Sequence, residues 1–238
     1  MQSPALSWLS VLDAPLSGAV RASFDGEGTL QALAGTLDIS QGVLQPTPAS
    51  TPVPFRSAAV YFDVDPAAQR IQFSTIEVAS DTLTLMASGT ADLTEFAGPW
   101  PGAFLGQLQI DNAAYASAGM FQEPFMVDRG MADFRLRLDP FTVEVGQVWV
   151  NAQDAEATAR GRIVADDSGW QVDLDAQSSA LDVRQLMASW PVFLAPGTRG
   201  WLDRNLQAGT LNNIAAALRF EAGRKPDIGF RSISKAAP

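Results

Sequence analysis

Carboxylates that recur next to one another, or two residues apart, are the first candidates for chemistry in this sequence. The pairs are Asp63/Asp65, Asp154/Glu156, Asp166/Asp167 and Asp173/Asp175. Two carboxylates flanking a cleft, one of them with a raised pKa, can hydrolyse a glycosidic bond. Alternate residues of a strand share a face, so Asp173 and Asp175 could point into one cleft. The favoured interpretation is the solvent-facing side of a strand whose other side carries apolar residues.

Three other patterns have a chemical meaning, and each has a plainer interpretation. Asp25-x-Glu27 and Asp63-x-Asp65 offer oxygens to Ca²⁺, but neither continues into a complete calcium loop, which favours turn residues. Residues 26–28 give half of a dinucleotide-binding fingerprint, which lacks its third glycine. Residues 232–235 fit a Ser-x-x-Lys pattern without its companion motifs. We therefore predict no metal ion, no cofactor and no catalytic residue.

The composition narrows the classes of function. The 238 residues include no Cys and no His, which removes thiolate chemistry, disulfides, imidazole ligands and histidine acid–base catalysis. The formal net charge of −10 disfavours a nucleic-acid partner. A hydrophobic fraction of 47% with 18% charged residues is typical of an ordered protein. The sequence contains no run of 18 apolar residues, so it predicts no membrane-spanning helix.

Most of the chain alternates apolar and polar residues, which predicts half-buried β-strands. Strands of this kind must bury their apolar sides, either in a closed sandwich or barrel or in a long sheet curled around its own apolar face. The alternation is compatible with both. The residues expected on the common apolar side, lining a groove, are Val60, Phe62, Val64, Ile71, Phe73, Leu83, Leu85, Leu108, Ile110, Phe134, Leu136, Leu138, Val143, Val145, Trp170, Val172 and Leu174.

The stretch 182–220 differs from the rest, because it predicts two helices followed by a strand. Asp182 can cap the first helix, and Gln185 completes a capping-box pair. Pro196 suits the first turn of the second helix, and Gly209 suits the left-handed residue that closes a helix. The residues expected to form this helix pair are Asp182, Leu186, Trp190, Pro196, Trp201, Leu202, Leu206 and Gly209. The two tryptophans among them are expected to pin the helices against the sheet.

The second half of the chain repeats the first. Asp139-Pro140 follows Asp65-Pro66 by 74 positions, and Gly161 follows Gly89 by 72. A break rich in Gly and Pro at residues 98–102 is the expected boundary. This predicts one β repeat over residues 1–98 and a second over 102–238, the second including the helix pair at 182–208.

A family resemblance rests on the same helical stretch. Its residues are Trp190-Pro191, Leu194-Ala195-Pro196, Arg199, Trp201-Leu202, Asn205-Leu206 and Gly209, followed by a strand rich in Ala and Leu. Residues 17–44 look like the repeated hairpins of the same family. The chain resembles the AsmA-like superfamily of bacterial envelope proteins, most closely the central region of its YhdP-type members. The resemblance covers most of the chain and is most specific in the stretch 182–220.

In that family a single N-terminal helix anchors a long periplasmic β-rich body to the inner membrane, and this repeating β-groove is implicated in moving phospholipid toward the outer membrane. The resemblance therefore implies a mostly β fold: a long curved antiparallel sheet that forms an apolar groove or taco-like half-barrel, with two short helices near 182–208. It also implies a periplasmic location. The sequence departs from the family by lacking the anchor helix, so we expect either a fragment of a longer chain or a soluble relative of the family.

Three functions are compatible with these observations. The first is a non-catalytic groove that binds phospholipid or another acyl-chain lipid and adjoins other repeats of the same long chain. The second is a structural or assembly scaffold for envelope proteins, whose exposed sheet edges capture partners by strand addition. The third is an envelope carbohydrate hydrolase that uses Asp173 and Asp175. We rank them in this order, because the alternation and the resemblance both favour the first.

Overall fold

The computed structural model describes residues 11–98, 100–117, 124–152, 155–190, 196–205 and 209–231. The strands are β1 Leu12–Asp13, β2 Leu16–Phe24, β3 Leu30–Ile39, β4 Gly42–Leu44, β5 Val53–Phe55, β6 Ser57–Asp65, β7 Arg70–Ala79, β8 Leu83–Thr94, β9 Ala103–Tyr115, β10 Phe125–Val127, β11 Arg129–Leu138, β12 Phe141–Ala152, β13 Ala155–Asp166, β14 Gly169–Asp182, β15 Thr210–Glu221 and β16 Asp227–Arg231. The helices are α1 Val183–Ser189 and α2 Pro196–Asn205. The predicted mostly β fold with two short helices is confirmed.

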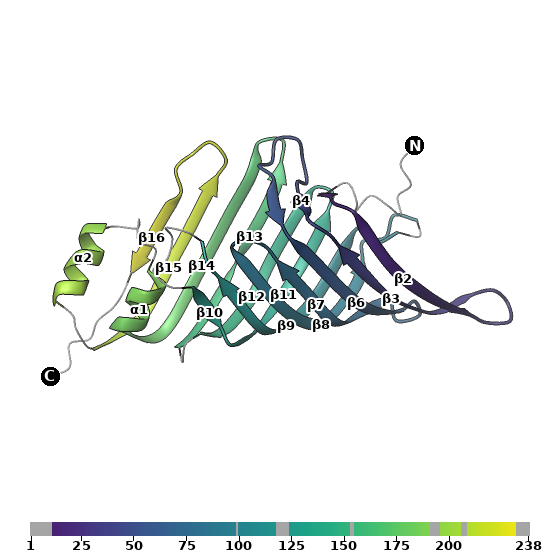
Figure 1. The fold of residues 1–238 in the computed structure, drawn as a ribbon, viewed down its shortest axis with the longest axis horizontal. Coiled ribbons are helices and arrows are strands. Elements are labelled where there is room, and N and C mark those ends of the chain that lie inside the picture. The colour runs from purple at the N-terminus through teal and green to yellow at the C-terminus, as the bar shows by residue number, and fades with distance from the viewer. Residues whose placement is uncertain are drawn as a thin grey trace.

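One 13-stranded antiparallel sheet contains nearly all of the strands (Figure 1). Its order is β16-β15-β14-β13-β12-β11-β9-β8-β7-β6-β3-β2, and β10 also pairs with β9. Nearly every strand pairs with its neighbour along the chain, because short turns join antiparallel partners. The sheet does not close on itself, since β2 and β16 lie at its opposite ends. Of the two architectures that alternation allows, the chain adopts the open curved sheet.

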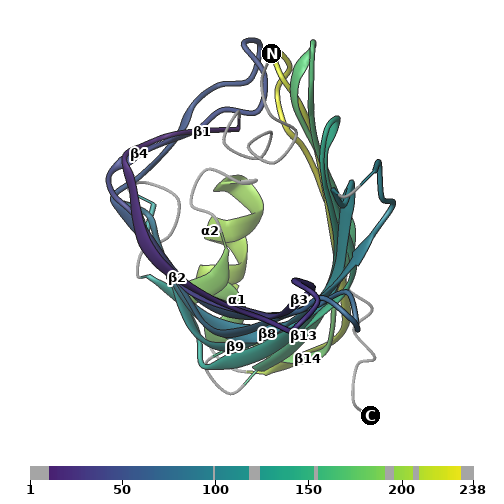
Figure 2. The same ribbon diagram turned by 90° about the vertical axis from the view of Figure 1, so that its right-hand side faces the viewer.

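The sheet curls into an open trough-like shape when it is viewed along its long axis (Figure 2). A second sheet of three short strands, in the order β1-β4-β5, lies across the concave side. It is joined to the far part of the large sheet by two hydrogen bonds. The Thr47 hydroxyl donates to the Asp166 carbonyl over 2.9 Å, and the Trp170 indole N–H donates to the Thr51 carbonyl over 2.7 Å.

A buried cluster lies where the small sheet meets strands β12 and β13 of the large sheet. Val11, Phe141 and Ala165 are buried together, and the Phe141 and Trp170 rings meet edge to face with centroids 5.7 Å apart. The half-buried residues around this cluster are Leu12, Leu44, Leu136, Leu138, Val143 and Trp170. The concave side of the large sheet is therefore the side that carries Phe141, Val143 and Trp170.

The two helices lie on the same concave side, near the β14–β15 end of the sheet (Figures 1 and 2). Asp182 caps α1 by accepting from the Arg184 N–H, and the reciprocal capping box with Gln185 is present, as the sequence predicts. Leu186 and Trp190 are buried against Leu181, Met187 and Leu211. No helix in the described part of the chain is long and apolar enough to span a membrane.

The strand registers show an internal repeat. Gly35 pairs with Phe62, Phe62 with Phe73, and Phe73 with Gly89. Gly106 pairs with Phe134, Phe134 with Val145, and Val145 with Gly161, so equivalent residues lie 71 or 72 positions apart. Even the bulges recur, since the shifts at Tyr61/Phe62 and Phe73/Ile76 match those at Asp133/Phe134 and Val145/Val148.

The proposed division at residues 98–102 falls between β8 and β9. These two strands pair along their whole length within one sheet, from Leu83↔Tyr115 to Thr94↔Ala103. Because the sheet is continuous across this point, the pairing does not test the division into two domains, which stays a prediction.

Candidate functional site

The residues predicted to line a groove all lie on one face of the large sheet. Residues paired across antiparallel strands share a face, so the face can be followed from strand to strand through the registers. Val64 pairs with Ile71, for example, and Leu136 with Val143. The same registers place the rest of the set on that face, from Val60 in β6 to Leu174 in β14. Since Val143 and Trp170 belong to it, this is the concave face.

Two neighbouring rows of apolar residues cross this face. The central apolar row is Ala22, Leu33, Val64, Ile71, Ala91, Gly106, Phe134, Val145, Gly161, Leu174, Leu218 and Ile228. The second apolar row is Val20, Gly35, Phe62, Phe73, Gly89, Leu108, Ala132, Val148, Ala159, Ala176 and Ala216. Neither row contains a charged or hydrogen-bonding side chain. With strands spaced about 4.8 Å apart, the central row is about 50 Å long.

Glycines in these rows are covered by side chains from the next strand. A Cβ atom added at Gly35 would lie 2.8 Å from Cζ of Phe62, and one at Gly106 would lie 2.7 Å from the ring of Phe134. A Cβ at Gly161 would lie 2.7 Å from Cδ2 of Leu174. The large side chains therefore lie over the glycines and fill the surface that these leave open. The result is a continuous apolar lining.

The small sheet covers part of this lining, at Leu136, Leu138, Val143 and Trp170, whereas the residues of the two apolar rows lie outside that buried cluster. Every predicted lining residue is half-buried, and none is fully buried. The chain exposes 14563 Å² of solvent-accessible surface, whereas a compact monomer of 25.3 kDa exposes about 10300 Å². A protein with 47% hydrophobic residues normally hides such an apolar face in its core. Contiguous exposed apolar surface is typical of a binding site.

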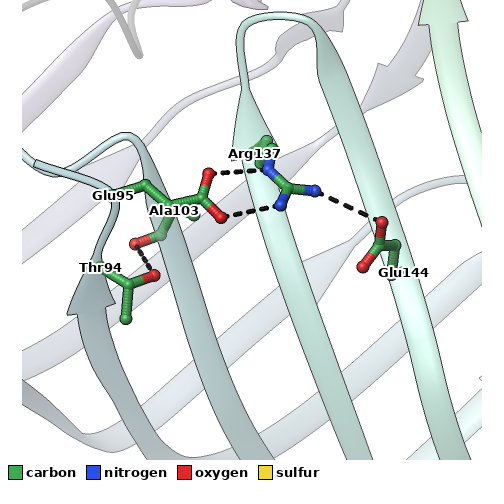
Figure 3. Close-up of polar contacts among 5 residues, drawn as sticks. All are labelled: Thr94, Glu95, Ala103, Arg137 and Glu144. Atoms are coloured by element: carbon green, nitrogen blue, oxygen red, sulfur yellow. Dashed lines mark hydrogen bonds and ion pairs between the residues drawn. The ribbon is translucent and has the colours of Figure 1, made fainter.

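The convex face is held by ion pairs between strands. Arg137 donates to both carboxylate oxygens of Glu95, over 2.7 and 2.8 Å, and to Glu144 over 3.3 Å (Figure 3). The hydrogen bond from Arg137 lowers the pKa of Glu95. Arg70 binds Asp92 over 2.6 Å in the same way, which lowers the pKa of Asp92. The charges of the sheet are thus gathered on the face opposite the apolar rows.

The carboxylate pair proposed for hydrolysis also lies on the convex face. Asp175 accepts from Arg219 over 2.6 Å, and Asp173 lies 3.7 Å from the same guanidinium. Both carboxylates therefore face one cation on an open surface rather than each other across a cleft. In the first half of the chain, Asp25 accepts hydrogen bonds from the backbone N–H groups of Glu27 and Thr29, as expected for a turn.

The other candidate carboxylates were considered as metal ligands. Across the described ranges, no group of three or more acidic residues lies close enough to hold a metal ion. Asp154 lies outside the described residues.

The helix pair is partly as predicted. Asp182, Leu186 and Trp190 cap and bury α1, and Gly209 has a φ of 139° while its carbonyl accepts from the Val183 N–H. The prediction for Trp201 is wrong, because 54% of this residue is exposed and it does not pin α2 to the sheet. Leu206 and the side chains of Pro196 and Leu202 lie outside the described residues.

Sequence reasoning missed the small members of the rows and the outermost strands. Gly35, Gly106 and Ala132 lie in the rows although they add almost no apolar area. Each lies two residues from a large apolar residue of the same strand (Leu33, Leu108 and Phe134), and this spacing could have revealed them. Val20 in β2 and Ile228 in β16 were also missed. No protein-family model, curated protein or solved structure matches this chain.

Proposed function

We propose that this chain is a non-catalytic β-groove segment that binds the acyl chains of phospholipid on its concave face. The observation that carries the proposal is the pair of uncharged apolar rows, which cross the sheet while their large side chains stay half-buried. Together with the resemblance to AsmA-like proteins, this supports a role in phospholipid transport between the inner and outer membranes. A periplasmic location, with the full-length protein anchored in the inner membrane, is part of the same proposal.

The dimensions and energetics of the rows suit an acyl chain. A bilayer core about 30 Å thick holds two opposed acyl chains, so each chain spans about 15 Å. The central row, at about 50 Å, is long enough for such a chain at several positions. Each CH₂ group removed from water contributes about 0.8 kcal/mol, so binding requires no specific polar partner. A lining without hydrogen-bonding groups also lets a chain slide, because no position is preferred over the next.

The test uses a pair of substitutions on neighbouring residues of β9. Leu108 lies in the second apolar row between Gly89 and Ala132, whereas Gln107 is exposed on the convex face. Leu108→Lys places a charge in the lining, and Gln107→Lys adds the same charge to the opposite face. The probe is a phosphatidylethanolamine with a fluorescent acyl chain, and binding is measured by fluorescence, with native mass spectrometry for co-purified lipid.

We expect the unmodified chain and Gln107→Lys to bind the probe equally, and Leu108→Lys to bind it more weakly, because a charge in the middle of the lining leaves an acyl chain fewer uninterrupted positions. Circular dichroism confirms that both variants fold. The proposal is wrong if the unmodified chain binds no lipid, or if both variants weaken binding to the same extent.

A further inference from the structure

A hollow on the convex face crosses strands β12 to β15. Its volume is about 520 Å³, which lies within the range of about 300 to 1000 Å³ that is typical of small-molecule sites. The registers place four of its residues in one line, from Trp149 to Thr158, Gln177 and Ala215. Each is next in sequence to a residue of the second apolar row, so each faces the opposite side of the sheet. The four strands lie inside the sheet, since β11 pairs with β12 and β16 with β15 (Figure 1).

Five polar side chains line this hollow, and none of them has a hydrogen-bond partner among the residues that the structure describes. Two are amides, two are hydroxyls and one is a carboxylate, namely Gln177, Asn213, Thr158, Ser179 and Glu156. Amides and hydroxyls both donate and accept hydrogen bonds. A hollow that gathers such groups suits a ligand that carries many hydroxyl groups of its own.

Trp149 adds an aromatic surface at one end of the line. Its side chain is half-buried, and the Arg129 guanidinium lies 5.8 Å from the centroid of its ring. Arg129 belongs to β11, which pairs with β12 on the side away from the hollow. The negatively polarised face of an indole attracts the C–H groups of a sugar ring, as it attracts cations. An indole beside free amides and hydroxyls is therefore the composition expected of a saccharide site.

The internal repeat contains a second hollow at the equivalent place, which allows a comparison. Glu77 in β7 pairs with Met86 in β8, and they precede Trp149 and Thr158 by 72 positions each. They line a hollow of about 500 Å³. Among the described residues, that lining contains three charged side chains and no aromatic one. The repeat thus produces the hollow, and Trp149 distinguishes the second hollow from the first.

We propose that the hollow over β12 to β15 binds a neutral oligosaccharide, with Trp149 stacked on one sugar ring and Gln177 and Asn213 bound to hydroxyl groups. The hollow spans four strands, or about 14 Å, which is longer than one sugar ring. The net charge of −10 and the carboxylate of Glu156 disfavour an acidic saccharide. Glu156 is the one carboxylate in the described lining, whereas glycoside hydrolysis normally needs two, so the proposal is binding without cleavage.

The test measures the binding of three trisaccharides by NMR titration: maltotriose, cellotriose and triacetylchitotriose. We expect at least one of them to bind the unmodified chain, and trigalacturonic acid, which carries three carboxylates, not to bind. Trp149→Ala should weaken the binding about 2- to 10-fold, the effect of losing one aromatic contact. Trp149→Tyr keeps an aromatic ring and should retain most of the affinity. The matched control is Trp201→Ala, which removes a tryptophan that is 54% exposed on α2 and should bind as the unmodified chain does.

A second variant keeps the test valid if Trp149→Ala disturbs the fold. Gln177 is exposed, so Gln177→Ala removes hydrogen-bonding groups from the hollow without emptying a packed site, and it should also weaken binding several-fold. Neither Trp149→Ala nor Gln177→Ala should change binding of the fluorescent lipid, because the two sites lie on opposite faces. Failure of all three trisaccharides to bind, equal binding of trigalacturonic acid, or unchanged binding in both variants would each overturn the proposal.

Discussion

Replacing Gly106 by alanine tests the packing within the central apolar row most directly. Gly106 lies in the central apolar row between Ala91 and Phe134. An added Cβ would meet the backbone carbonyl of Thr90 and would lie 2.7 Å from the Phe134 ring. The ring can rotate, but the carbonyl is held in the β8–β9 ladder. The methyl group can therefore fit only if the two strands separate locally.

The expected cost follows from this contact. Overpacked sites lose about 1 to 3 kcal/mol of unfolding free energy, and contact with a fixed carbonyl points to the upper end of that range. For a chain of this length, each kcal/mol lowers Tm by about 2 to 4 °C. We expect Gly106→Ala to lower Tm by about 6 to 12 °C.

The matched control is Gly146→Ala in β12. A Cβ there would lie 3.7 Å from the nearest atom, Cβ of Asp133, which is an ordinary contact. Gly146→Ala should leave the stability unchanged or raise it by up to about 1 kcal/mol, because alanine reduces the entropy of the unfolded chain. Thermal unfolding followed by circular dichroism compares the two variants. Equal stability of Gly106→Ala and Gly146→Ala would refute the close approach of the Thr90 carbonyl to Gly106.

Two further predictions concern the helix pair and the convex face. Leu186→Ala should raise amide hydrogen exchange in α1, because it empties a buried site worth about 2 to 3 kcal/mol, while exchange in β6–β8 stays unchanged. Trp201→Ala should leave both regions as they are, and faster exchange in this variant would contradict the exposed placement of Trp201. Glu95→Gln should lower Tm near pH 7, because it removes the carboxylate that binds Arg137. Since that pKa is lowered in the folded chain, the contribution is present above the ordinary carboxylate pKa of about 4.3 and is lost as the pH falls through the folded value. The Tm values of the unmodified chain and of Glu95→Gln, plotted against pH, should therefore converge in acid. A constant difference in Tm down to low pH would contradict this account.

Much of the fold follows from the sequence because a strand in a one-sided sheet alternates strictly. Phe134, Leu136 and Leu138 alternate with charged residues, and β11 places them on the concave face. The changes of phase after Phe73 and after Val145 mark real bulges. The helix cap at Asp182 was predictable because capping depends on local hydrogen bonds.

Other features depend on distant contacts and were not predictable. The apolar alternation changes phase between Ala34 and Leu37, which predicts a bulge at Gly35, but β3 continues through it in regular register, since a glycine satisfies either parity. The stretch that begins at Ala113 is compatible with a short helical turn from its sequence alone, but β9 extends to Tyr115 because β8 and β10 pair with it there. Whether the sheet closes depends on how its two end strands meet. Trp201 has the same apolar character as Trp190, and only the packing around α1 and α2 distinguishes them.

The small sheet of β1, β4 and β5 has a mechanical consequence. It leaves the large sheet after β3 and is tied to Asp166 and Trp170 on strands that lie far from β3 in the sheet order. The small sheet therefore stabilises the curvature of the large sheet, because flattening the large sheet would break these hydrogen bonds and the cluster around Phe141. The trough should therefore open most easily in the parts of the large sheet that lie away from these contacts.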